Sequence, residues 1–426
     1  MPASFIIKDV RTLDPTTGVD ELRDIFVAEG RIEATPPSDA QVISGHGKLL
    51  IPGLIDLHVH LREPGGEESE TLETGSRAAA RGGFTTIVAM PNTRPAHDTA
   101  ETVGFVLRRG TEIGRTRILP SGAITIDRKG KELTNLAALA GAGAVAFSDD
   151  GTTVQDDALM RRAMDVARDL NRPIMDHAQD NLIEREGGVM HEGEVSKGLG
   201  LPGIPTFAEE RIIRRDIELA EATGCALHIQ HVTSRNGTEL IRAARARGIS
   251  VTGELTPHHL TLCDEDLDPK NASFKMNPPL RSRDDRDALE AALLDGTLSC
   301  FATDHAPHSA DKKARGFLKA PFGIVGLETA VGLTWTHLVR SNKMTAMDWL
   351  RRWTTEPAKI IGRPHPTLTP GAIADLTLLD VASPWVVHPN EFATKSHNTP
   401  FAGRTLYGRA VATWLNGRLV WRENGF

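Results

Sequence analysis

The central part of the chain alternates short β-branched runs with helical stretches, and this alternation restricts the fold more than any other feature of the sequence. Eight such runs can be counted, at residues 54–60, 84–90, 117–122, 144–148, 172–177, 226–231, 249–254 and 299–304. The clearest helices lie at 206–224, with Thr206 as N-cap and Gly224 as C-cap, and at 284–296, closed by Gly296. Repeated strand–helix units form parallel sheets, so we predict an α/β fold of the (β/α)8 TIM-barrel type. An open, doubly wound sheet is the alternative, but no GxGxxG motif follows the first run.

The two ends of the chain have a different pattern. Residues 4–51 and the segment from Gly371 onward contain short runs of alternating apolar and polar residues, broken by Pro, Gly and Asp, which is typical of small antiparallel strands. Asn416-Gly417 is a strong hairpin signal. We therefore expect residues 1–52 and 367–426 to form one small β-sandwich domain, and residues 53–366 to form the catalytic barrel.

The composition excludes several classes of protein. The chain has 426 residues, a formal net charge of -7 and three cysteines without CxxC spacing. The acidic balance argues against nucleic acid as the main ligand, and the cysteines indicate neither a disulfide framework nor a thiolate zinc site. No signal peptide is evident and no segment approaches 18 uninterrupted apolar residues, so we expect a cytoplasmic protein without a membrane partner.

Metal-capable side chains gather at the ends of the predicted strands, which is where the active sites of TIM barrels lie. Five of the eight runs end in such residues: His58 with His60, Asp149 with Asp150, His177, His231 and Asp304. The two histidines of the HxH motif point to the same face of a strand and could bind one ion. Taken alone, this motif is at least as often a pair of packed histidines, and most carboxylates placed like Asp304 are turn or cap residues. The combination favours a metal site.

Imidazole and carboxylate ligands without thiolates suit divalent ions such as zinc, manganese or iron. Four histidines and two aspartates are enough for two ions, and we expect zinc. Two ions that share a water can lower its pKa towards ~7 and create a hydroxide nucleophile at neutral pH. Asp304 could accept the proton of that water and pass it to a departing nitrogen.

The sequence resembles the dihydroorotase family of the amidohydrolase superfamily, over almost the whole chain. The segments that carry the resemblance are PGLIDLHVHLREPG, GGFTTIVAMPNTRPAHD, FSDDG, MDHAQD, VTGELTPHHL, FKMNPPLR, ATDHAPH, APFGI and NTPFAGRTLYGRAV. The resemblance implies six metal ligands: His58 and His60 on one ion, His177 and His231 on the other, Asp150 between them, and Asp304 on the first ion as proton shuttle. It also implies substrate contacts: Arg62, Asn92 and His308 with a carboxylate, Asn277 and the Phe322–Gly323 backbone with the ring amide, and His60 beside them.

One departure from the wider superfamily concerns the bridging ligand. Hydantoinases, dihydropyrimidinases and allantoinases generally place a carboxylated lysine on the fourth strand, where this chain reads AFSDDG. Lys129 and Lys131 belong to the preceding loop, so a carboxylate should bridge the ions. Spacing alone does not choose between Asp149 and Asp150, and the resemblance favours Asp150. His258 and His259 are expected to support or pack around the site without binding metal.

The resemblance implies a dihydroorotase, which interconverts (S)-dihydroorotate and N-carbamoyl-L-aspartate in de novo pyrimidine (UMP) biosynthesis. A hydantoinase or dihydropyrimidinase acting on uncharged rings is one alternative. An inactive, dihydroorotase-like scaffold subunit of aspartate transcarbamoylase is another, although such a subunit should lack metal ligands. The resemblance also admits a homodimer or an association with aspartate transcarbamoylase. The segment of about 305–320 is expected to form a lid over the site.

Overall fold

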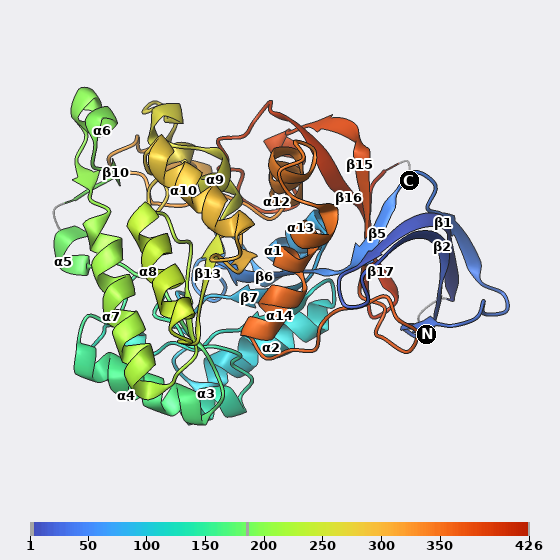
Figure 1. Cartoon of the computed structure of the whole chain (residues 1–426), viewed down its shortest axis with the longest axis horizontal. Helices are drawn as coiled ribbons and strands as arrows, with labels where there is room; N and C mark the ends of the chain where they lie inside the picture. Colours follow the sequence, from blue (N-terminus) through green and yellow to red (C-terminus); the bar gives the residue numbers. More distant parts are fainter. Residues whose placement is uncertain (1–3, 185–186, 425–426) are drawn as a thin grey trace.

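The computed structural model describes residues 4–184 and 187–424 of the chain. In Figure 1 a sheet made from both ends of the chain lies at one side of a larger body in which helices surround short strands. The α/β character predicted from the alternating runs is confirmed.

The terminal sheet has eight strands drawn from both ends of the chain. They are β1 (Phe5–Asp14), β2 (Val19–Ala28), β3 (Arg31–Glu33), β4 (Gln41–Ser44), β5 (Leu49–Pro52), β15 (Leu376–Val386), β16 (Thr405–Leu415) and β17 (Arg418–Arg422). Their order is β17-β16-β15-β5-β1-β2-β3, with β4 paired to β1, so β5 and β15 join the two halves. The predicted hairpin connects β16 and β17, and Asn416 and Gly417 both have the positive φ that such a two-residue turn requires.

The strands of the larger body form two parallel sheets. One contains β6 (Leu54–Val59), β7 (Phe84–Ala89) and β8 (Arg117–Pro120), and the other β9 (Ile174–Asp176), β12 (Leu227–Ile229), β13 (Val251–Leu255) and β14 (Cys300–Phe301). Isolated parallel bridges connect them: Phe147 pairs with Gly122 and Ile174, and Val59 pairs with His305. Seven of the eight predicted runs thus contain strands. The eighth, 144–148, has β-bridges only at Phe147, although Val145, Ala146 and Ser148 also make backbone hydrogen bonds to the segment of Pro120 and Gly122.

Helices connect these strands, and their ends follow the capping signals of the sequence. The longer helices are α1 (Leu72–Gly82), α2 (Ala100–Ile113), α4 (Asp157–Asp169), α7 (Phe207–Thr223), α8 (Arg235–Ala246), α10 (Arg283–Leu294) and α13 (Ala346–Trp353). Gly224 ends α7 in the left-handed conformation, as predicted, but Thr206 has helical dihedrals and its side chain makes no capping bond. Ser282 caps α10 instead of a residue within 284–296, and Asp295, before Gly296, ends it.

Shorter elements complete the chain. They are α3 (Leu136–Gly141), α5 (Asn181–Glu184), β10 (Met190–His191), α6 (Glu194–Leu199), β11 (Gly203–Ile204), α9 (Pro257–Thr261), α11 (Ala310–Lys313), α12 (Ala330–Thr334) and α14 (Thr355–Ile360), with single 3-10 or π turns at Ile126–Arg128, Asp264–Asp266, Ala272–Phe274, Trp335–Val339 and Pro389–Glu391. Several of them lie in the segments that follow the parallel strands.

Both faces of the parallel strands are buried. On β6, Leu54 packs in a large cluster with Phe84, whereas Ile55 and Leu57 pack in a second cluster with Val88. All six residues of β6 are buried. Strands enclosed on both faces are held rigidly along their length, so the residues at their carboxyl ends are well positioned for a site.

Candidate metal and substrate site

Six side chains from the ends of different strands converge on one buried point. His58 is the last residue but one of β6 and His60 follows this strand. Asp150 follows the 144–148 run, and His177, His231 and Asp304 follow β9, β12 and β14. These are the six predicted metal ligands, and each is at most 5% exposed. Residues far apart in the sequence therefore meet at the mouth formed by the strand ends.

Asp150 lies at the centre of this cluster. Its Oδ1 is 3.2 Å from His58 Nε2, 3.7 Å from His177 Nδ1 and 4.0 Å from His231 Nε2, and its Oδ2 is 3.6 Å from His60 Nε2. Potential ligand atoms of Asp150, His58 and His60 lie within 4.8 Å of one another, and so do those of Asp150, His177 and His231. Asp150 is thus shared by two groups that could each hold an ion.

Asp304 completes the first group. Its Oδ1 lies 2.9 Å from His60 Nε2 and 3.6 Å from His58 Nε2. His177 Nδ1 and His231 Nε2 approach to 2.8 Å in the second group. The donor set fits divalent metal ions, because buried nitrogen and oxygen atoms such as His58 Nε2 and Asp150 Oδ1 face each other without a hydrogen-bond partner in the structure.

The outer ring nitrogens of the first group have hydrogen-bond partners that leave the inner nitrogens free for an ion. His58 Nδ1 donates to Glu254 Oε1 over 2.8 Å, and His60 Nδ1 donates to Asn92 Oδ1 over 2.8 Å. Such bonds fix the tautomer in which Nε2 carries a lone pair. Asn92 also donates to Asp150 Oδ2 over 3.3 Å, so it connects two predicted ligands.

The two neighbouring aspartates are in different surroundings. Asp149 accepts a hydrogen bond from the Thr125 backbone N–H over 3.0 Å and another from the Thr125 hydroxyl, and burial raises its pKa to about 6. Burial alone would also raise the pKa of Asp150, but the facing charges of His58 and His60 hold it well below its usual range. Asp149 therefore holds the segment of Thr125 in place, whereas Asp150 faces the histidines.

Glu254 is a residue of this site that sequence reasoning missed. It lies within β13, accepts from His58 Nδ1 and from the His231 backbone N–H (3.1 Å) through Oε1, and accepts from His228 Nε2 over 2.9 Å through Oε2. These contacts outweigh its burial and lower its pKa to about 2. The signal was available, since Glu254 is the one charged residue in the run 249–254.

Three predicted site residues have positive φ. Arg62, His231 and Asp304 have φ values of 60°, 30° and 45°. This region is sparsely occupied by residues other than glycine, and it is costly unless the surroundings enforce it. Such residues gather at functional sites, so the backbone geometry independently marks this cluster.

A cavity of about 320 Å³ opens above the cluster. Its lining contains eleven of the predicted site residues, His60, Arg62, Asn92, Asp150, His177, His231, Asn277, Asp304, His308, Phe322 and Gly323, together with Gly151, Ala306 and Pro321. The remaining one, His58, is fully buried beneath it. The predicted substrate contacts thus surround a single space next to the predicted metal ligands.

Arg62 and His308 lie together on one side of this cavity. Arg62 Nε donates to the Pro307 carbonyl over 3.2 Å, and His308 Nε2 donates to the Phe322 carbonyl over 2.6 Å. Burial lowers the pKa of Arg62 to about 10, so it remains a cation at neutral pH. Burial and the nearby Arg62 lower the pKa of His308 to about 2, which keeps this ring neutral.

Asn277, which also lines the cavity, donates to Gln179 Oε1 over 2.9 Å, and Gln179 Oε1 accepts from His177 Nε2 over 2.9 Å. Gln179 was not identified from the sequence. His258 and His259 lie outside both metal-capable groups found in the described part of the chain. His259 donates to the Pro278 carbonyl over 2.9 Å and so supports the turn that carries Asn277.

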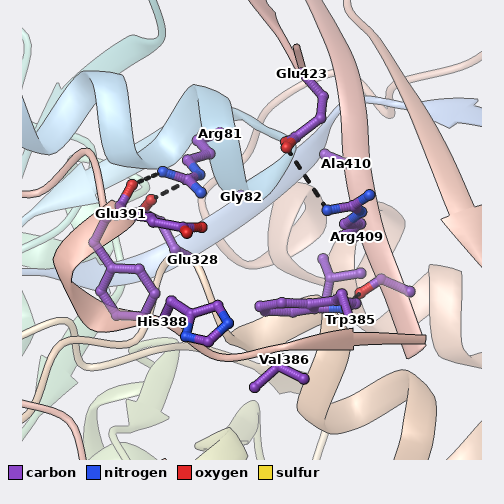
Figure 2. Close-up of a pocket in the computed structure, with 13 residues that line it drawn as sticks. Arg81, Gly82, Glu328, Trp385, Val386, His388, Glu391, Arg409, Ala410 and Glu423 are labelled. Carbon is purple, nitrogen blue, oxygen red and sulfur yellow. Dashed lines mark hydrogen bonds and ion pairs between the residues drawn. The ribbon is translucent and has the colours of Figure 1, made fainter. Parts of the chain in front are cut away.

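The segment of Glu391 lines a second cavity, separate from the substrate cavity. Glu328 accepts from the backbone N–H groups of Ala393 and Thr394 and pairs with Arg81, and Figure 2 shows Arg81 between Glu328 and the carbonyl of Glu391. This cavity measures only about 60 Å³. Two ion pairs, Arg81–Glu328 and Arg409–Glu423, line it, which indicates a structural junction.

Farther along the same segment, Asn398 contacts the loops of the substrate cavity. Its side chain accepts from the His308 backbone N–H over 3.0 Å and donates to the carbonyls of Ala306 and Gly323 over 3.2 and 3.0 Å. A Cβ at Gly323, where φ is 134°, would lie 2.7 Å from both Cβ and the carbonyl oxygen of Ala306, so only glycine fits this approach.

Comparisons with known proteins show which chains this one is similar to. A family profile described as "Dihydro-orotase-like" matches residues 47–237. A dihydroorotase of Halalkalibacterium halodurans is 48% identical over 95% of this chain and 96% of that relative, and one of Pelotomaculum thermopropionicum is 47% identical over 98% and 99%. A third, from Geobacillus kaustophilus, is 50% identical over 91% and 90%.

Among solved structures, the L-hydantoinase of Arthrobacter aurescens matches with a TM-score of 0.86 and 25% identity, over 99% of this chain and 96% of that one. The dihydropyrimidinase of Brevibacillus agri matches with a TM-score of 0.83 at 22% identity, over the same shares, which is a likeness of fold alone. Within the described residues, no helix combines the length and the apolar character needed to cross a membrane.

Proposed function

Because the chain belongs to the dihydroorotase family, we propose that it catalyses the reversible hydrolysis of (S)-dihydroorotate to N-carbamoyl-L-aspartate in de novo pyrimidine biosynthesis. The relatives named dihydroorotase cover nearly the whole chain at 47–50% identity. The chain is accordingly a cyclic-amide hydrolase. The observation that carries the proposal is the convergence of six predicted ligands beneath a cavity whose wall contains the half-buried, cationic Arg62.

We propose that residues 53–366 form a closed (β/α)8 barrel and that residues 1–52 and 367–426 form a β-sandwich domain beside it. Support for closure comes from the parallel bridges on either side of the two sheets, at Phe147 and between Val59 and His305. Support for the second domain comes from the sheet that both chain ends share.

The proposed cofactor is a pair of divalent metal ions, most simply zinc. His58, His60 and Asp304 would hold one ion, His177 and His231 the other, and Asp150 both. When bound, such ions polarise the amide carbonyl and lower the pKa of a water between them towards ~7.

The chain itself supplies proton transfer through Asp304. Hydrolysis adds the oxygen of water to the amide carbonyl carbon, breaks the bond from that carbon to the ring nitrogen, and moves one proton of the water to the nitrogen. Asp304 lies at the cavity wall beside His60, where its carboxylate can take that proton and return it to the leaving nitrogen. In the reverse direction the same group takes the proton from the attacking nitrogen.

The other residues orient the substrate. Arg62 can bind the ring carboxylate through its guanidinium, with His308 and Asn92 beside it. Asn277 and the Phe322–Gly323 backbone, which also line the cavity, offer amide groups to the ring. His60 lies between these residues and the metal ligands.

A hydantoinase-type substrate is the second candidate, because the L-hydantoinase of Arthrobacter aurescens is similar to this chain over nearly its whole length. The half-buried arginine in the cavity wall favours a ring with a carboxylate over an uncharged one. An inactive scaffold subunit is disfavoured by the complete ligand set.

The test is turnover of dihydroorotate against hydantoin by the purified protein, before and after metal removal and zinc reconstitution, for the wild type and Arg62→Met. We expect dihydroorotate to be the preferred substrate, activity to require metal, and Arg62→Met to lose about 100-fold in kcat/KM for dihydroorotate only. If the wild type preferred hydantoin, the second candidate function would replace the first.

The location and the partners are parts of the same proposal. The three cysteines are buried and unpaired, which fits the reducing cytoplasm. Association as a homodimer or with aspartate transcarbamoylase is a hypothesis that the mass of the purified protein, alone and mixed with that enzyme, tests.

A further inference from the structure

Lys313 is a buried lysine that the proposed mechanism does not use. It ends α11, in the segment after Asp304 for which the sequence predicted a lid, and it is 8% exposed. Its Nζ donates hydrogen bonds to three backbone carbonyls: Ala272 over 2.9 Å, Lys275 over 3.1 Å and Pro321 over 2.9 Å. An ammonium group has three N–H donors, so all of them are engaged.

The three carbonyls belong to the two segments that form one wall of the substrate cavity. Ala272 and Lys275 precede Asn277, and Pro321 precedes Phe322 and Gly323; Asn277, Phe322 and Gly323 all line the cavity. Lys313 therefore connects two segments that line the same substrate cavity.

Lys275 adds two further connections between these segments. Its backbone carbonyl also accepts from the Gly323 N–H over 2.9 Å, and its Nζ donates to the Leu318 carbonyl over 3.0 Å and lies 4.6 Å from the centre of the Phe322 ring. The two segments are thus joined by backbone carbonyls and lysine ammonium groups.

Apolar packing supports part of this wall. Met276 and Ile324 are buried in one hydrophobic cluster with Phe401, and Phe317 is buried in another with Met190. Packing is less complete beside Lys313, because another cavity of about 560 Å³ is lined by Ala272, Lys313 and His308 among others. At this place the position of the wall, and with it the width of the substrate cavity, depends on the hydrogen bonds of the ammonium group.

Burying a lysine at this position costs desolvation free energy. Among the residues that the structure describes, no carboxylate lies within ion-pair distance of Lys313, and burial together with the charges of Lys275 and Arg62 lowers its pKa to about 7. An apolar side chain would avoid that desolvation, but it could not donate to three carbonyls.

We propose that Lys313 is a positioning residue for the substrate pocket, which holds the segments of Asn277 and Phe322–Gly323 at the spacing that the cyclic substrate requires. This inference rests on the proposed function. Lys313 acts through those segments and contacts neither substrate nor the metal ligands, so its loss should weaken substrate binding and leave the metal site intact.

The test compares Lys313→Met with Lys312→Met. Methionine keeps the length of the side chain but donates no hydrogen bond, and Lys312 is an adjacent lysine whose partner is the surface residue Glu68. KM and kcat for dihydroorotate, metal content and the thermal midpoint are measured for both variants and for Lys313→Arg.

We expect KM to rise about tenfold in Lys313→Met, with kcat changed by less than about threefold and metal content unchanged. In Lys312→Met, KM should stay within about twofold, and Lys313→Arg should recover most of the loss because guanidinium donates to several carbonyls. An unchanged KM in Lys313→Met, or a fall in metal content and kcat without a change in KM, overturns the inference.

If Lys313→Met does not fold, the pH dependence of KM decides. Above its pKa a neutral amine has two N–H donors for three carbonyls, whereas arginine at this position stays charged. The other charged or titratable groups facing Lys313 are Lys275, Arg62 and His308, and the pKa values of Arg62 and His308, about 10 and about 2, lie outside the tested range. The ratio of wild-type KM to that of Lys313→Arg should rise between pH 6 and pH 8.5; a constant ratio overturns the inference.

Failure of the proposed function gives a different result. If the wild type does not turn over dihydroorotate, the proposed function is refuted. The role of Lys313 in holding the wall can then be tested by hydrogen exchange. The amides of residues 272–277 and 316–323 should then exchange faster in Lys313→Met than in Lys312→Met, or in Lys313→Gln if the methionine variant is unstable. Equal exchange in both segments refutes the role of Lys313 without reference to turnover.

Discussion

The metal cluster and the wall of the substrate cavity are neighbours, but they are built in different ways. The cluster consists of side chains at the ends of parallel strands, fixed by further buried side chains such as Glu254. The wall consists of irregular segments whose backbone carbonyls accept hydrogen bonds from Lys313, Lys275 and Asn398, with cavities lined by its residues. Damage to the first should therefore appear in turnover and metal binding, and damage to the second in KM.

The largest expected effect is that of Asp304→Asn in the cluster. The amide keeps the size of the side chain but cannot take a proton, so kcat should fall about 1,000-fold while the metal content and KM stay near the wild-type values. Steady-state kinetics with metal analysis of the same preparation measure this. Turnover within tenfold of the wild type would show that Asp304 is not the group that transfers the proton.

Glu254→Gln should give the next largest effect, and it should act on the metal. The neutral amide weakens the hydrogen bond that orients His58, and we expect metal affinity to fall about 10- to 100-fold, with kcat little changed at saturating metal. Competition with a chelator measures the affinity. Glu239→Gln, on the surface of α8, is the control, and equal affinities for the two variants would contradict the role given to Glu254.

Asn398→Ala addresses the wall. It removes three hydrogen bonds to the loops of His308, Ala306 and Gly323, so KM for dihydroorotate should rise about fivefold while metal affinity is unchanged. Asn236→Ala, at an exposed position on α8, should leave KM unaffected. A loss of metal instead of an increase in KM would show that wall and cluster are not separable.

The smallest effect concerns an ion pair outside both regions. The hydrogen bond from His337, with a further contribution from Lys343, lowers the pKa of Glu290 to about 2. A carboxylate with a lowered pKa stabilises the fold above its unfolded pKa of about 4.5, and this stabilisation is lost as the pH falls towards 2. Because the group is partly exposed and screened by solvent, the gain is at most about 1 kcal/mol.

The thermal midpoint of the wild type should accordingly fall more than that of Glu290→Gln between pH 5 and pH 3, and activity at pH 7 should be the same for both. Parallel decreases in the two midpoints would show that the pair contributes nothing to stability.

The sequence predicted the cluster better than the wall, for physical reasons. Strand-end histidines such as His58 and His177 are visible because the ends of parallel strands meet in space, whatever the details of the loops. Glu254 was missed although it is the one charged residue in the run 249–254, because a charge within a strand does not show which side chain it faces. The hydrogen bonds of Lys313 could not be predicted from the sequence, because its partners are backbone carbonyls and every residue has one.

The same limit applies to the fold. The runs that became β6, β7 and β13 were evident from their β-branched residues, and the Asn416-Gly417 hairpin from its turn chemistry. The run 144–148 has the composition of a strand but pairs only at Phe147, because tertiary contacts decide how far a short ladder extends. Thr206 has the right identity for a cap, yet its backbone dihedrals are helical.

The contact between Asn398 and the loops at Ala306 and Gly323 has a consequence for how the protein is made. A ribosome adds residues in order, so every histidine and aspartate of the cluster has been synthesised before Asn398 emerges. The nascent polypeptide can thus acquire its ions before it can shape the pocket for a ligand. We expect the pocket to reach its full affinity for substrate only when the segment of Asn398 has been synthesised and contacts those loops.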